Sequence, residues 1–150
     1  MHPADLLGAV QRATVERSGI DPAVIGQVIA GCVSQTGEQT FDIGRTAWLG
    51  AGLPIGVAAT TVDAQCGSSQ QATNLAAALI AAGVVDSAVG CGVESMSRIP
   101  LGVAVKQGPG RPITKAYFDI YEYATQFEAA ERIADKWGIT RADCDQFGFE

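Results

Sequence analysis

The sequence predicts an α/β fold with a mostly parallel sheet, from three observations. Segments rich in β-branched and small apolar residues at 24–33, 57–64 and 86–93 indicate buried strands. Helical segments separate them, and strands that alternate with helices are typical of a parallel sheet with helices on its faces. The chain has 150 residues, about one domain by length, and only 17% of them are charged.

The first two predicted helices pack on this sheet. The first covers 3–18 and ends at Gly19, a residue suited to a helix end. Its apolar side is predicted to consist of Leu6, Leu7, Val10 and Val15. Asp42 can cap the second helix, which runs to about residue 50 or 52.

The third predicted helix, over 67–82, is rich in alanine. From Ala72 onward its only polar residues are Thr73 and Asn74, and Gly83 ends it. A helix that is apolar nearly all round is buried on more than one face. We therefore expect a layered sandwich in which this helix is an inner element.

The composition changes near Val105. No lysine or arginine occurs from 46 to 97, whereas eight of the ten aromatic residues follow residue 105. We predict one unit over 1–105 and, over 106–150, a Gly/Pro-rich linker and the beginning of a second domain. Helices are predicted there over about 123–137, ended by Gly138, and from Thr140, with Asp143 completing a capping box.

The net charge and the hydropathy of the sequence exclude some classes of function. Sixteen acidic against ten basic residues give a net charge of −6, which argues against nucleic acid as a partner. No run of about 18 apolar residues is present, so we expect no membrane span. The first ten residues lack the basic region of a signal peptide, which favours a cytoplasmic location.

Four cysteines lie at 32, 66, 91 and 144, with a single histidine, His2. Their spacing does not fit a zinc site, and a cytoplasmic chain is not expected to carry a disulfide framework. Cys32 and Cys91 fall within predicted strands as small core residues. Cys144 is predicted to be exposed, and His2 to lie at a frayed chain end.

Cys66 stands out because it lies where the strand over 57–64 turns into the alanine-rich helix. A helix N-terminus stabilises a thiolate, and ligands bind at the carboxyl ends of parallel strands. A buried, inert cysteine is the alternative. Glu94 follows the next strand and is either a base or a partner in loop or helix-cap hydrogen bonds.

Several of these motifs together resemble the thiolases, a family of acetyl-CoA acyltransferases. They are CGSSQQA at 66–72, ESMSRIP at 94–100, GRTAWLGAGLP at 44–54 and AERIADKWGITRADCDQF at 130–147. The resemblance covers nearly the whole chain. It implies a layered α/β fold, and an oligomer, dimer or tetramer, of the full-length protein.

The resemblance also implies a chemistry. Cys66 matches the family nucleophile, which carries the acyl group as a thioester and whose N–H forms part of an oxyanion hole. The substrates would be 3-ketoacyl-CoA and free CoA, or two acyl-CoA molecules in the condensing direction. No cofactor beyond these CoA thioesters is implied, and no residue of this chain is assigned to binding them.

The chain departs from the family pattern at three places. They are Ser68–Ser69, where Ser-Gly is usual, Cys91–Gly92, where Gly-Gly is usual, and Gln126–Phe127 near the acyl pocket. The Gln126–Phe127 pair favours a degradative enzyme that acts on a bulky or steroid-like acyl group. The family's first strand, catalytic histidine and second cysteine are not among these residues. We therefore expect the N-terminal half of a thiolase, without turnover on its own.

Two other readings stay open at this point. A ketoacyl-synthase-type condensing enzyme is related, but it usually carries Thr-Ala-Cys-Ser-Ser around its nucleophile. A non-catalytic thiolase-like partner subunit would use the low charge and an open sheet edge to bind another chain.

Overall fold

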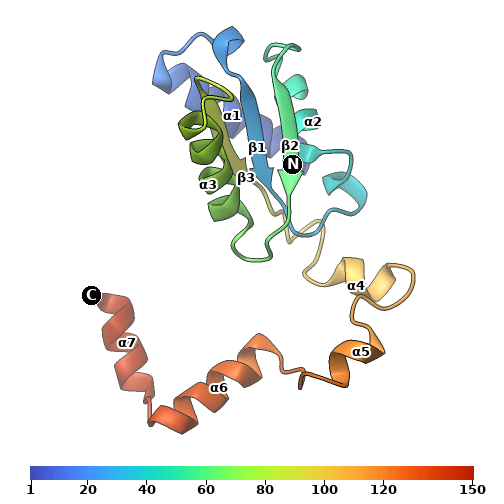
Figure 1. Ribbon diagram of the computed structural model, residues 1–150, viewed down its shortest axis with the longest axis vertical. Coiled ribbons are helices and arrows are strands. Elements are labelled where there is room, and N and C mark those ends of the chain that lie inside the picture. The colour runs from blue at the N-terminus through green and yellow to red at the C-terminus, as the bar shows by residue number, and fades with distance from the viewer. The chain divides into compact units, whose positions relative to one another are not determined.

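A computed structural model describes all 150 residues, which form two compact units, Met1–Pro109 and Gly110–Glu150. The first unit contains the sheet and most of the helices (Figure 1). Its helices and strands are α1 (Pro3–Ser18), β1 (Gln27–Gly31), α2 (Ile43–Gly50), β2 (Ala58–Val62), α3 (Ser68–Ala81), β3 (Ala88–Gly92) and α4 (Val103–Gln107), with short 3-10 turns at Pro22–Val24 and Gly37–Gln39.

The sheet has three strands in the order β2-β1-β3, and both pairings are parallel. Gln27 at the start of β1 is opposite Ala58 on one side and Ala88 on the other, so the three strands end at the same edge. This confirms the predicted parallel α/β fold. Each strand is shorter than its predicted segment, because the flanking residues form the turns that enter and leave the sheet.

Alternate residues of β1 face two different layers. Val28 and Ala30 pack with α1 and α2, whereas Ile29 packs with α3 on the opposite face of the sheet (Figure 1). The central strand is therefore buried on both sides. That is the arrangement its run of apolar residues predicts.

The predicted limits of α1 are confirmed, and Gly19 ends it at φ 70°. The predicted apolar side is partly wrong. Leu6 and Val10 are 42% and 51% exposed. The buried stripe consists instead of Pro3, Ala4, Leu7, Gly8, Gln11 and Val15. Small residues lie in it because α1 crosses α2 closely: a Cβ at Gly8 would come within 3.0 Å of the Ala47 carbonyl oxygen.

His2 is not frayed, contrary to prediction. Its Nδ1 accepts a hydrogen bond from the Ala4 N–H at 3.2 Å, which makes it the N-cap of α1. Asp42 precedes α2, as predicted, but makes no side-chain cap hydrogen bond. Its backbone is left-handed at φ 48°, and its carboxylate accepts from the Thr61 hydroxyl, so it joins α2 to β2 instead.

The alanine-rich helix α3 is buried along one face only within this unit. Ser68, Ala72 and Ala76 lie against the sheet. The predicted burial on more than one face is not reached, since the unit supplies a single layer beneath α3 and no element above it. Ile80 on the outer side is 42% exposed.

The second unit is helical, with α5 (Lys115–Phe118), α6 (Gln126–Trp137) and α7 (Arg141–Phe149). Helix α6 begins three residues after its predicted start, because Thr125 is its cap. Gly138 ends α6 at φ 64°, and the Thr140–Asp143 capping box of α7 is present; both are as predicted.

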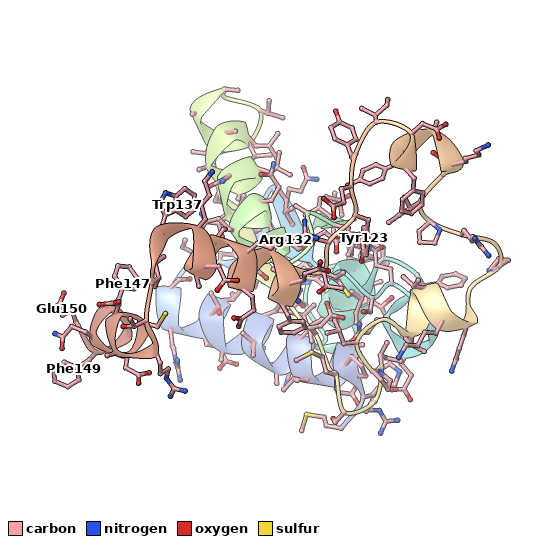
Figure 2. All side chains as sticks on the ribbon, turned by 90° about the horizontal axis from the view of Figure 1, so that it is seen from below. Tyr123, Arg132, Trp137, Phe147, Phe149 and Glu150 are labelled. Atoms are coloured by element: carbon pink, nitrogen blue, oxygen red, sulfur yellow. The ribbon has the colours of Figure 1, made fainter.

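The side chains of this unit are largely open to solvent. Arg132 forms ion pairs with Glu122 and Glu128, while Phe147 and Phe149 project from α7 and are 85% and 88% exposed (Figure 2). Across both units, the length and hydropathy of every helix fall short of what a bilayer-spanning segment requires.

Candidate active site

Cys66 lies at the carboxyl edge of the sheet, in the turn that joins β2 to α3. Its side chain is exposed. The preceding residue, Gln65, has a left-handed backbone at φ 53°, a conformation that costs a non-glycine residue about 1–3 kcal/mol. We call residues 63–68 the elbow. It reverses the chain sharply and presents the Cys66 thiol beside the first turn of α3.

Two side chains hold the elbow in this shape. The Asp63 carboxylate accepts from the Gln65 N–H at 2.8 Å. The Ser68 hydroxyl accepts from the Ala64 N–H at 2.9 Å and donates to the Gln65 carbonyl oxygen at 2.5 Å. The strained peptide before Cys66 is therefore fixed by hydrogen bonds from both ends of the turn.

Two glycines let the first turn of α3 lie directly on the sheet. A Cβ added at Gly31, the last residue of β1, would come closer than 3.0 Å to the Ser68 carbonyl carbon and the Ser69 nitrogen. A Cβ at Gly92, the last residue of β3, would collide with the Ser69 hydroxyl. The ends of two strands thus form the platform on which the elbow rests.

The two loops after β1 and β3 are joined by a hydrogen-bond network around Glu94, which is half-buried. Its carboxylate accepts from the Val33 and Ser34 N–H groups at 2.9 and 3.2 Å and from Gln39 Nε2 at 2.8 Å. Gln39 is fully buried, and its Oε1 accepts from the Ser95 N–H at 2.8 Å. Of the two roles open to Glu94, the geometry supports the loop hydrogen-bond role, since this carboxylate is occupied by three donors.

The other cysteines are not placed for catalysis. Cys32, just past β1, is 1% exposed. Burial, with the charges of Glu94 and Asp63, raises the pKa of its thiol to about 11. Burial also raises the pKa of the Cys91 thiol, which receives a hydrogen bond from Gln11. Cys32 is a core residue, as predicted, whereas Cys91 is only half-buried and packs against the core. Cys144 is exposed on α7, as predicted.

Sequence reasoning missed Ser68, Gln39 and the two platform glycines. In the sequence Ser68 stands out only as part of a serine pair, and Gln39 lies in a polar segment that suggests an exposed loop. For Gly31 and Gly92 the sequence does contain a signal, since each lies near the end of a predicted strand. A glycine at the carboxyl end of a strand often marks a place where another backbone comes close.

Comparison with known proteins identifies the class. The sequence profile of the thiolase N-terminal domain matches residues 1–150. The chain therefore belongs to the thiolase family. The predicted resemblance is confirmed, including its restriction to the N-terminal part of the family.

Individual relatives agree with this assignment. The chain is 39% identical to the steroid 3-ketoacyl-CoA thiolase FadA6 of Mycobacterium tuberculosis, with 98% of this chain and 38% of the relative covered. It is 39% identical to a β-ketoadipyl-CoA thiolase of Acinetobacter baylyi, with 97% and 40% covered. The chain thus spans about two fifths of the length of these relatives.

A solved structure supports the fold independently. The crystal structure of the acetyl-CoA acetyltransferase of Bacillus anthracis superimposes with a TM-score of 0.73 at 29% identity, over 94% of this chain and 38% of that one. The predicted thiolase-like α/β fold is confirmed.

Proposed function

We propose that the protein carrying this chain is a thiolase that cleaves 3-ketoacyl-CoA with free CoA, and that Cys66 is its nucleophile. The observation that carries this proposal is the elbow. It is the one place where an exposed thiol lies at the start of a helix, at the edge where parallel strands end. Membership of the thiolase family supports thiolysis of a 3-ketoacyl-CoA as the reaction of that thiol.

The chemistry follows from the position of the sulfur. Cys66 Sγ attacks the 3-keto carbon, and the bond between C2 and C3 breaks. Acetyl-CoA leaves as an enolate that takes up a proton, and the shortened acyl group stays on Sγ as a thioester. The thiol of a second CoA then attacks this thioester and releases Cys66.

For these reaction steps the chain supplies the nucleophile and one hydrogen-bond donor. The Cys66 N–H has no hydrogen-bond partner within the chain, so it is available to the oxyanion that forms on the attacked carbonyl. The only histidine, His2, has its Nδ1 engaged at the cap of α1. We propose that proton transfer is performed by residues in the part of the relatives' length that these 150 residues do not match.

The class of acyl group, the oligomeric state and the cellular location are also proposals. Gln126 and Phe127, together with the steroid thiolase among the relatives, support a bulky ring-bearing acyl group. We propose a homo-oligomer in the cytoplasm, with acyl-CoA and CoA as partners and no further cofactor. Some relatives are named as peroxisomal, so fractionation of the producing cell is the test of location.

Steady-state thiolysis by the complete polypeptide encoded by the gene tests the reaction. We expect 3-ketoacyl-CoA to disappear only when free CoA is present. Cys66→Ala should lower the rate by roughly a thousandfold or more, whereas Cys144→Ala should leave it unchanged. Condensation without thiolysis would instead favour the ketoacyl-synthase-type reading. No reaction at all would favour a non-catalytic partner subunit.

The acyl class is tested by the ratio of kcat/KM for two substrates, one ring-bearing and one straight-chain 3-ketoacyl-CoA. A higher value for the ring-bearing substrate is expected. A higher value for the straight-chain substrate would overturn the acyl class while leaving the thiolase reaction in place.

A further inference from the structure

We propose that Ser68 is the positioning residue of Cys66: its hydroxyl bridges the Ala64 N–H and the Gln65 carbonyl and so fixes the left-handed peptide that presents the thiol. The inference rests on the proposed role of Cys66. Ser68 itself does not touch substrate in this account, because its side chain is 4% exposed and points into the elbow.

Both hydrogen bonds of the Ser68 hydroxyl are to backbone groups of the elbow. It accepts from one backbone group and donates to the next carbonyl, both on the amino side of Cys66. The Ser68 N–H also donates to the Gln65 carbonyl at 2.9 Å. Residue 65 is thereby tied to the first residue of α3 by two bonds, so the left-handed conformation is held by the helix itself.

The sheet fixes Ser68 from the other side. The Ser68 carbonyl lies directly on Gly31, where no Cβ fits. The first turn of α3 therefore packs directly against the end of β1. Because Ser68 packs against the sheet, the hydrogen bonds of its hydroxyl fix the peptide before Cys66 relative to the end of β1.

Without the hydroxyl, the Ala64 N–H loses its acceptor and the Gln65 carbonyl loses one of its two donors. The Ala64 N–H has no other acceptor, and the strain at Gln65 is opposed only by Asp63 and the Ser68 N–H. The elbow would then relax toward a right-handed or extended conformation at Gln65. The thiol would then leave the position at the start of α3 that the elbow gives it.

Ser69 provides a matched control, since it is the next residue in the same turn. It is exposed, and its hydroxyl makes no hydrogen bond within the chain. Two other cysteines report on the state of the fold. Cys144 is exposed on a different unit and serves as a reference thiol, while buried Cys32 reacts only when the first unit opens.

The experiment is competitive alkylation of the complete polypeptide encoded by the gene with iodoacetamide, read for each cysteine by peptide mass spectrometry. We expect Cys66 to react faster than Cys144 in the wild type and in S69A. In S68A the rate at Cys66 should fall roughly three- to tenfold, the range that one net hydrogen bond gives, while Cys32 stays protected.

The outcomes separate the two proposals. If Cys66 reacts no faster than Cys144 in the wild type, the proposed nucleophile fails, and Ser68 has nothing to position. If Cys66 is fast in the wild type and equally fast in S68A, only the role of Ser68 is overturned. If S68A leaves Cys66 fast but makes Cys32 reactive, Ser68 supports the fold and does not position the thiol.

Discussion

Gly31 and Ser68 touch backbone to backbone, at the end of the central strand and the start of the helix that follows Cys66. The contact leaves no room for a Cβ at Gly31. It joins the best-buried strand of the sheet to the elbow. The placement of the candidate nucleophile thus depends on a residue without a side chain, 35 positions earlier in the sequence.

Gly31→Ala should therefore disturb the elbow as well as the fold. The added Cβ would force α3 away from β1, and overpacking of this kind costs about 1–3 kcal/mol. Urea unfolding should show that loss. Gly50→Ala is the control, since Gly50 lies in a helix with nothing within 4 Å of the added Cβ. Equal stability of G31A and the wild type would contradict the close contact.

The Glu94 network predicts a second loss of stability. Glu94→Gln replaces an acceptor of three hydrogen bonds with an amide whose NH₂ faces backbone donors. A buried unsatisfied group costs about 1–3 kcal/mol, so the urea midpoint should fall. Glu131→Gln, at an exposed position without an ion pair, should change it little. A stable E94Q would mean that the two loops are joined by other contacts.

The raised pKa of Cys32 predicts destabilisation at alkaline pH. Burial and the nearby Glu94 and Asp63 charges raise the folded-state pKa from 9.0 to about 11, so the unfolded chain releases this proton first. Stability from this group is full below pH 9 and is lost as the pH rises toward about 11. The loss is at most roughly 2–3 kcal/mol.

Urea unfolding over this alkaline range measures the effect. Cys32→Ala should flatten the fall in unfolding free energy between pH 9 and about 11, whatever it costs at neutral pH. Cys144→Ala should leave the fall unchanged, since Cys144 is exposed. An identical alkaline slope in C32A and the wild type would show that Cys32 ionises as readily in the folded chain as in the unfolded one.

Local signals in the sequence were enough for the order of elements and the position of Cys66. Gly19, Gly83 and Gly138 end helices because each has a positive φ, and a strand followed by Cys-Gly and a long apolar helix marks the turn. These features depend on neighbours within a few residues. The limits of α1, α3 and α7 could accordingly be predicted within a residue or two.

Contacts between distant segments could not be predicted in the same way. Nothing local to Gln39 reveals that Glu94 and Ser95 bury it, 55 and 56 positions later. The prediction for the buried stripe of α1 is partly wrong for a related reason. Its close crossing with α2 favours small residues over Leu6 and Val10, and hydrophobicity alone does not indicate such a crossing.

The most direct test of the account is the search for an acyl group on Cys66. The complete polypeptide is mixed with acetoacetyl-CoA, quenched in acid and digested for mass spectrometry. We predict an acetyl thioester on the peptide that contains Cys66, absent in C66A and discharged by added CoA. An acetyl group on another cysteine, or cleavage of acetoacetyl-CoA with Cys66 never modified, would contradict the role assigned to the elbow.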